Sequence, residues 1–229
     1  MKFGVIMDVE ASRAIRQAEV SASRTMIERT EACFGIKPKW LAADTAYGSA
    51  PNLDWLVNEK GIAPHVPVID KSKRDDGTFS RDEFVYDKGR DIYTCPSGKS
   101  LKTTGRLVNG GATLLYRAST SDCGPCPLKS RCCPASPQRK VPRDVNEDAR
   151  DVARAIARTE EFAQSRRDRK KVEMLFAHLK RILRLGRLRL RGPRGAQFEF
   201  TLAAIAQNLR RLGKLTVRPP PAVTAKCVA

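Results

Sequence analysis

A stretch of nine residues, Trp40–Gly48, decides the fold and reads WLAADTAYG. Its apolar half, Trp40–Ala43, predicts a short strand, and the small residues after Asp44 predict a turn. Asp44 is therefore expected at the carboxyl end of a strand, where open α/β sheets bind their ligands. A carboxylate in that place can hold a metal ion, and an aspartate that only caps the following turn is an equally common outcome.

The elements around this stretch alternate between strands and helices. We expect a strand at 3–10, a helix at 12–33, a helix at 49–60 and an edge strand at 62–69. This order favours an α/β fold. β segments are expected at 84–93 and 107–116, and long helices at about 145–158, 161–185 and 196–212, the last two separated by a basic joint at 186–195.

The charge of the chain points to a polyanionic partner. The 229 residues carry a formal net charge of +18, and residues 139–218 alone hold 22 basic and nine acidic side chains. Nucleic acid is the favoured partner, and an anionic membrane surface is the competitor. No stretch approaches 18 uninterrupted apolar residues, so the sequence predicts no membrane span. The first residues do not form a signal peptide, and we expect a cytoplasmic protein.

One acidic residue stands out in the long helix expected at 161–185 because its neighbours are basic. Residues 166–194 contain twelve Lys and Arg but only two acids, Asp168 and Glu173. Arg169 and Lys180 fall within about 40° of Glu173 on a helical wheel. A solvated face with i,i+4 ion pairs is the common outcome of such spacing. The alternative is a carboxylate kept ionised beside cations that contact phosphate.

A strand-end aspartate and a helical glutamate can converge on the same cations. Asp44 and Glu173 would then bind Mg²⁺ (or Mn²⁺), the ions that support in-line attack on a phosphodiester. The surrounding basic residues would hold the nucleic-acid backbone.

Both motifs resemble those of one family. The stretch Leu41–Gly48, and the Arg-x3-Glu-x6-Lys spacing of Arg169, Glu173 and Lys180, are similar to the DDE transposases of bacterial insertion sequences. The resemblance implies a ribonuclease H-like core, with Asp44 as the second catalytic Asp and Glu173 as the catalytic Glu. It also implies binding to double-stranded DNA, both transposon ends and target, with a homodimer in the DNA complex. The expected DNA-binding residues are Arg166, Arg169, Lys180, Arg184, Arg187, Arg189, Arg191 and Arg194.

The chain departs from the family pattern at two places. The family signature has a Tyr where this sequence has Arg166, which preserves a phosphate contact but not stacking on a base. The family's first Asp lies on a strand before the one that residues 4–9 resemble. Asp8 is the nearby candidate, and we interpret it as an ordinary strand-end residue. We therefore expect the first core strand to be missing and the chain to be inactive alone.

Five cysteines between the two acidic motifs predict a zinc site. The preferred ligands are Cys95, Cys123, Cys126 and Cys132, with Cys133 as the substitute for the last. A close Cys-x2-Cys pair with two further thiolates suits tetrahedral Zn²⁺. The alternative is a group of reduced thiols in a loop-rich insertion, as expected in a reducing compartment.

The predicted organisation has four parts. Residues 1–69 form the first part of the ribonuclease H-like core, 70–143 a β-rich cysteine-containing insertion, 144–213 the helices with the catalytic Glu, and 214–229 a disordered tail. The predicted function is metal-dependent DNA cleavage and strand transfer. One alternative is a non-catalytic DNA-binding remnant that acts as accessory or competitor of a full-length transposase. A weaker one is a zinc-ribbon RNA-binding protein, for which 6% aromatic residues leave few stacking platforms.

Overall fold

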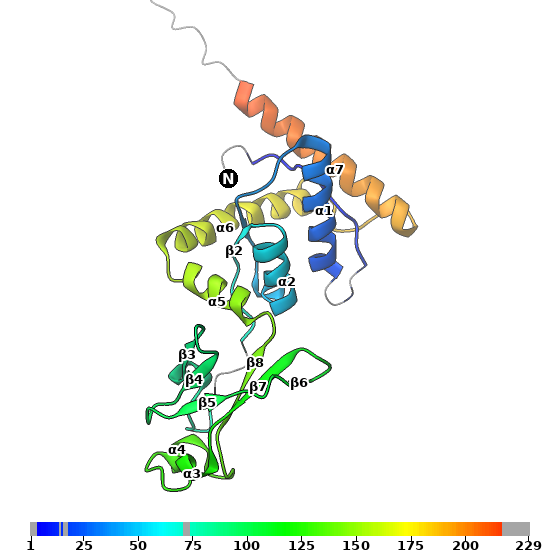
Figure 1. Cartoon of the computed structure of the whole chain (residues 1–229). Helices are drawn as coiled ribbons and strands as arrows, with labels where there is room; N and C mark the ends of the chain where they lie inside the picture. Colours follow the sequence, from blue (N-terminus) through cyan, green and yellow to red (C-terminus); the bar gives the residue numbers. More distant parts are fainter. Residues whose placement is uncertain (1–3, 14, 16–17, 71–73, 217–229) are drawn as a thin grey trace, which may run out of the picture. The chain divides into compact units, whose positions relative to one another are not determined.

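A computed structural model describes residues 4–13, 15, 18–70 and 74–216 (Figure 1). The chain forms two compact units, which are described separately. One is continuous and comprises Lys39–Phe162, here called the sheet unit. The other, the helical unit, comprises Met1–Pro38 and Ala163–Ala229. The architecture is mixed α/β, as expected from the sequence.

The sheet unit begins with a pair of parallel strands. Strand β1 (Trp40–Ala42) pairs with β2 (Ala63–His65), with Leu41 opposite Pro64. The connection is a short 3-10 turn, η1 (Thr45–Tyr47), then α2 (Ala50–Asp54), which continues as a π-helical turn, η2 (Trp55–Glu59). Helix α5 (Glu147–Ile156) packs against α2 and β2. Leu53, Val66, Ala149 and Ala153 form the shared core.

An antiparallel sheet fills the sequence between β2 and α5. Its strands are β3 (Val85–Asp87), β4 (Ile92–Thr94), β5 (Ser100–Lys102), β6 (Leu107–Val108), β7 (Thr113–Arg117) and β8 (Lys140–Asp144). The order is β3-β4-β5-β7-β6, and β8 pairs along the length of β7 (Figure 1). A 3-10 turn, η3 (Arg81–Glu83), precedes the sheet, and two one-turn helices, α3 (Thr120–Cys123) and α4 (Lys129–Cys132), lie between β7 and β8. Aromatic and apolar side chains, Tyr93, Leu101, Tyr116 and Val141 among them, form its core.

The helical unit combines segments from both parts of the sequence. Its helices are α1 (Ala18–Phe34), α7 (Gly192–Thr216) and most of α6 (Glu160–Arg181). Residues 4–11 run as an extended segment against α7. Asn208 exchanges two hydrogen bonds of 2.8 Å with the backbone of Ile6, and Gln197 bonds the backbone of Val9 and Ala11. Two amide side chains thus take the place of a neighbouring strand.

Several predicted boundaries need correction. The strand expected at 3–10 is absent from its described residues, 4–10, because the side chains of α7 satisfy their backbone. The helix expected from residue 12 begins at Ala18, and the edge strand of 62–69 is confined to Ala63–His65. Helix α7 begins at Gly192 and runs to Thr216, which places residues 214–216 of the expected tail in a helix. The rest of that tail, 217–229, lies outside the described residues.

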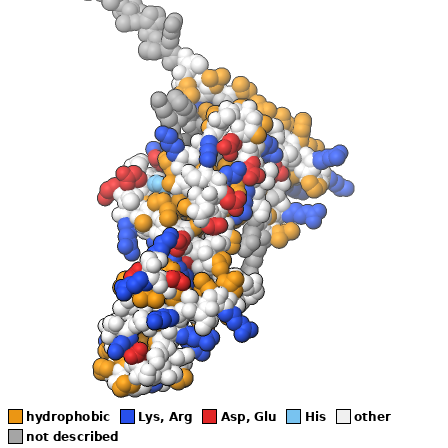
Figure 2. Space-filling view, in the orientation of Figure 1, with side chains coloured by type: hydrophobic (Ala, Val, Ile, Leu, Met, Phe, Trp, Pro, Cys, Tyr) orange, Lys and Arg blue, Asp and Glu red, His pale blue; other side chains and the backbone are white. Residues whose placement is uncertain are grey.

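The surface is mixed in character. Lys and Arg side chains are spread over the face shown in Figure 2, with hydrophobic side chains exposed among them. In the described part of the chain, no helix is both long enough and apolar enough to cross a bilayer.

Candidate functional site

Asp44 lies two residues after β1, at the carboxyl end of the strand as predicted. The residue is exposed, and its side-chain Oδ1 accepts a hydrogen bond of 2.9 Å from the N–H of Ala46. Asp44 therefore caps η1, the structural role that the sequence left open. The cap leaves the residue accessible, so capping and metal binding are compatible at this position.

Gly48 closes the turn after Asp44 because its backbone touches the chain beyond β2. A Cβ at this position would lie 1.9 Å from the carbonyl oxygen of Pro67, and the Gly48 carbonyl accepts the N–H of Ile69. Only glycine fits this approach. The turn that carries Asp44 is thus fixed to the parallel strand pair by backbone contacts.

Glu173 lies near the middle of α6 with its side chain 60% exposed. Arg169 Nε lies 3.3 Å from Glu173 Oε1, one turn earlier on the helix. Lys180 is exposed, and no carboxylate in the described part of the chain lies within ion-pairing distance of it. Of the two cations predicted beside Glu173, Arg169 forms an ion pair with it and Lys180 lies beyond ion-pairing distance. Arg166 is exposed on the same helix.

The two acidic candidates belong to different compact units. Asp44 is in the sheet unit and Glu173 in the helical unit. Their convergence on one metal site stays a prediction. In the described part of the chain, no three His, Cys, Asp or Glu side chains are grouped so that they could hold a metal ion.

The segment between α6 and α7 concentrates exposed positive charge. Arg184, Arg187, Arg189, Arg191 and Arg194 are all exposed. None of these five has a carboxylate within ion-pairing distance among the residues that the structure describes. The guanidinium groups are therefore available to an anionic ligand such as a DNA phosphate.

The cysteines of the insertion line a single small cavity. Cys95, Cys123, Cys126, Cys132 and Cys133 border a volume of about 20 Å³. The backbone N–H of Lys99 donates to Cys95 Sγ at 3.3 Å, and Cys126 Sγ lies 3.3 Å from the Ser97 hydroxyl.

The thiols differ in environment. Burial raises the pKa of Cys132 to about 11, and burial likewise raises the pKa of Cys123. The hydrogen bond from Ser97, with help from the Leu128 N–H, lowers the pKa of Cys126. Cys132 and Cys133 are both buried in the core of the sheet, and Cys123 packs against that core.

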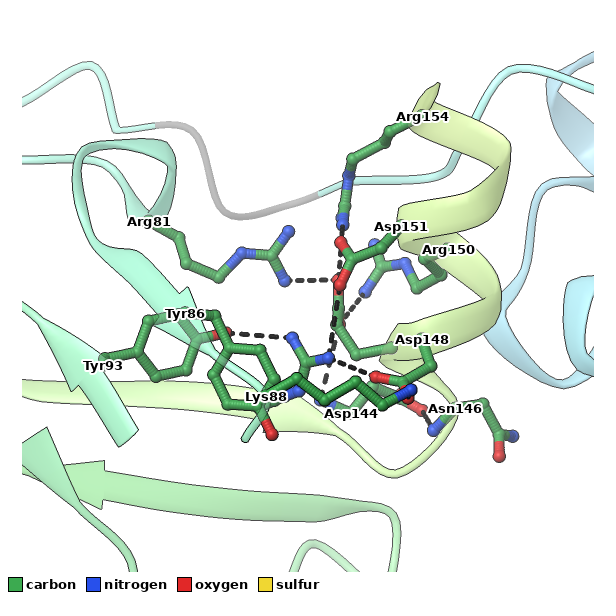
Figure 3. A network of polar contacts seen from close by, with 12 residues as sticks. Arg81, Tyr86, Lys88, Tyr93, Asp144, Asn146, Asp148, Arg150, Asp151 and Arg154 are labelled. Carbon is green, nitrogen blue, oxygen red and sulfur yellow. Dashed lines mark hydrogen bonds and ion pairs between the residues drawn. The ribbon is translucent and has the colours of Figure 1, made fainter. Parts of the chain in front are cut away.

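A buried ion network joins the sheet to α5, and sequence reasoning missed it (Figure 3). Glu147, 1% exposed, pairs with Arg81 at 2.5 Å, Arg154 at 2.8 Å and Arg150 at 3.0 Å. Burial opposes ionisation of Glu147, but the three guanidinium groups outweigh it and lower its pKa. Asp70 pairs with Arg81 and Arg154, which ties the end of the parallel-strand region to the same network.

Arg143 on β8 connects this network to two tyrosines of the sheet, Tyr86 and Tyr93. Its guanidinium donates to Tyr93 Oη at 3.2 Å and to Asp148 Oδ1 at 2.5 Å, and it stacks 3.8 Å from the centre of the Tyr86 ring. The spacing of Glu147, Arg150 and Arg154 on one helix face could have suggested half of this network. Arg81, 66 residues earlier, could not be paired with them from the sequence.

Comparison with known families identifies the chain. The model of the transposase DDE domain matches residues 94–213, which is more than half of the sequence. The chain belongs to the transposase DDE domain family. The matched residues of this DDE domain begin just before Cys95 and include the cysteine cavity, α6 with Glu173, and the basic segment. Asp44 lies before the matched range. No curated protein and no solved structure gave a match.

Proposed function

We propose that this transposase DDE domain binds double-stranded DNA and contributes to metal-dependent phosphodiester cleavage and strand transfer. The family match over α6 and the basic segment is the observation that carries the proposal. Glu173 is an exposed carboxylate on α6. The segment after this helix contains five exposed arginines with no carboxylate partner among the described residues. Such an arrangement places an acidic residue close in sequence to groups that hold a DNA backbone. A ribonuclease H-like arrangement of the core, and a dimer on DNA in the cytoplasm, are parts of the same proposal.

Asp44 and Glu173 are the residues that would hold Mg²⁺ or Mn²⁺. Both are exposed carboxylates, the hard oxygen ligands that these ions prefer. A bound divalent ion would stabilise the charge that develops on the phosphate. Arg169 pairs with Glu173 along α6, and Arg166 and Lys180 would contact the DNA near it.

Asp8 is not part of the proposed site. Arg29 donates to both of its carboxylate oxygens, at 2.7 and 2.8 Å, and also contacts Glu10 at 2.9 Å. A carboxylate neutralised in this way is a poor metal ligand. With only two of the three family carboxylates assigned, we propose that this polypeptide alone cleaves DNA weakly or not at all.

The incomplete acidic site, together with the exposed arginines, favours a second candidate function. A DDE domain whose acidic site is incomplete can still bind DNA through its arginines and compete with, or assist, a complete transposase. The two functions differ in what Glu173 does, because a catalytic carboxylate is needed for turnover and a bystander is not.

A nicking assay on supercoiled DNA with Mg²⁺ or Mn²⁺ tests these alternatives. For the catalytic proposal, Glu173→Gln abolishes nicking and leaves DNA affinity unchanged or higher, while the control Glu160→Gln on the first turn of α6 nicks normally. No nicking by any variant, with intact DNA binding, selects the binding function. Strong nicking that Asp8→Ala abolishes would show that Asp8 is the third ligand.

We further propose that the cysteine cavity binds one Zn²⁺, which would draw together thiols that line the cavity but are not grouped as metal ligands in the described part of the chain. The ligands would be Cys95, Cys123, Cys126 and Cys132, with Cys133 as the alternative to Cys132. The support is their shared cavity and the backbone N–H of Lys99, which donates to Cys95 Sγ, since such bonds stabilise coordinated thiolates. The ion would stabilise an insertion with a small core.

Metal analysis of the purified protein tests the zinc proposal. We expect near one equivalent of zinc, lost in Cys126→Ser and kept in Cys33→Ser, a cysteine of α1 outside the cavity. Comparison of Cys132→Ser with Cys133→Ser identifies the fourth ligand. Protein that contains no zinc after purification without chelators would rule the site out.

A further inference from the structure

The basic segment before α7 is shaped by one carboxylate. Glu199 Oε1 accepts the backbone N–H groups of Arg189 and Leu190, at 2.7 and 2.6 Å. Residues 182–191 form no helix or strand, so these two bonds stand in for a regular backbone pattern. The segment is thereby fastened to the second turn of α7.

A glycine on the same face of α7 permits this approach. Gly195 precedes Glu199 by four residues, so both positions lie on one side of the helix. A Cβ on Gly195 would lie 2.7 Å from Leu190 Cβ and 3.1 Å from its carbonyl carbon. Two independent contacts therefore hold Leu190 against the start of α7.

Glu199 is unusual in its surroundings. Residues 174–216 contain ten Lys and Arg and no other acid. Its carboxylate nevertheless bonds the backbone, and the five exposed arginines around the segment have no acidic partner in the described part of the chain. The acid therefore orders the segment without neutralising it.

We propose that Glu199 is a positioning residue for DNA binding. By fixing the backbone at Arg189 and Leu190, it presents Arg187, Arg189 and Arg191 together toward the phosphates of one duplex. A segment ordered before binding loses less conformational freedom when it binds. This inference rests on the proposed binding of DNA and adds to it the residue that organises the contact.

Whether Glu199→Ala raises or lowers DNA affinity distinguishes a positioning role from a purely electrostatic effect. Removal of a carboxylate from a chain of +18 makes the protein more positive, which by itself strengthens binding to DNA. For Glu199→Ala we expect the reverse, a loss of about tenfold in DNA affinity. This loss corresponds to the entropy cost of ordering one or two arginine side chains on binding. Glu199→Gln keeps an acceptor oxygen and has the same change of charge, so it should bind at least as tightly as the unmodified protein.

The experiment is a titration of the full chain onto a labelled duplex of random sequence at several salt concentrations. Glu19→Ala, an exposed acid at the start of α1, is the control for charge and should bind at least as tightly as the unmodified protein. Glu199→Ala should also show a shallower dependence of log affinity on log salt, because fewer phosphates are held together. Gly195→Ala introduces a good helix former into α7, and its new methyl group displaces Leu190 from the helix. It should therefore weaken DNA binding as Glu199→Ala does.

The outcomes are distinct. If the unmodified protein binds DNA and Glu199→Ala binds as tightly as Glu19→Ala with an unchanged salt slope, the positioning role is overturned. If neither the unmodified protein nor Glu19→Ala binds, the proposed DNA binding fails, and the positioning role with it. If Glu199→Ala does not fold, Gly195→Ala decides: normal affinity and salt slope overturn the role, and weakened binding supports it.

Discussion

At the scale of single residues, the sheet unit depends on positions where no other side chain fits. Gly48 is the clearest, because the Pro67 carbonyl occupies the space of its missing side chain. Gly48 lies four residues after Asp44. It therefore determines both local stability and the shape of the turn that carries Asp44, a proposed metal ligand.

Gly48→Ala should lower the free energy of unfolding by about 2 to 3 kcal/mol, because the new methyl group forces the backbone apart. Urea unfolding followed by circular dichroism measures the change. Gly89→Ala is the matched control, since its Cβ would meet only Asp87 Oδ1, at an ordinary 3.5 Å. Equal stability of the two variants would contradict the assigned contact.

At the scale of elements, α5 is secured to the antiparallel sheet through Glu147. This carboxylate at the start of the helix is buried among guanidinium groups from η3 and from α5 itself. Removing its charge leaves buried cations without a partner, which costs more than an exposed ion pair contributes.

Glu147→Gln should therefore destabilise the sheet unit by about 3 to 5 kcal/mol. Asp151→Asn, at a half-exposed position that pairs with Arg143 and Arg154, should cost less than about 1 kcal/mol. Thermal and urea unfolding give both values. A loss below 1 kcal/mol for Glu147→Gln would mean that the network contributes little to the attachment of α5.

Which elements the sequence could predict depended on where their partners lie. Strand β1, the helical segment of 50–59 and α6 follow from local periodicity and lie within a few residues of their predicted bounds. The strand expected at 3–10 is wrong because its backbone partners, Gln197 and Asn208, lie on the last helix. The same reason explains why Arg81 could not be paired with Glu147, and why the role of Glu199 was not foreseen.

At the scale of the whole molecule, the stability of the sheet unit should depend on pH. Glu147 and Asp148 both have lowered pKa values in the folded state, Glu147 through the three arginines against the effect of burial, and Asp148 through Lys88. A carboxyl group with a lowered pKa stabilises the fold above its unfolded pKa, and that contribution is lost as pH falls through the folded pKa.

The melting temperature of the sheet unit should thus be constant near neutral pH and fall below about pH 4.5, where the unfolded state takes up protons first. Scanning calorimetry between pH 7 and pH 3 measures the dependence. Glu147→Gln should flatten it, because the variant has one titrating carboxyl group fewer. An unchanged slope in the variant would assign the acid sensitivity to other groups.

For the site as a whole, sequence reasoning identified the residue types and the family, and the family is confirmed. The chemistry of Asp44, Glu173 and the cysteines stays a prediction, since metal binding depends on side chains from distant segments. Spacing along one helix predicts neighbours well, as the Arg169–Glu173 pair shows. The sequence does not predict whether residues 129 positions apart, such as Asp44 and Glu173, are neighbours in the fold.

The bond between Ile6 and Asn208 has a consequence for how the chain is made. Its partners are 202 residues apart, and the helical unit draws on both the first and the last segments of the sequence. The sheet unit is continuous and can fold as soon as residue 162 has left the ribosome. Residues 4–11 are synthesised before the sheet unit and must wait for α7. For this segment, the order of synthesis and the order of folding are therefore opposite.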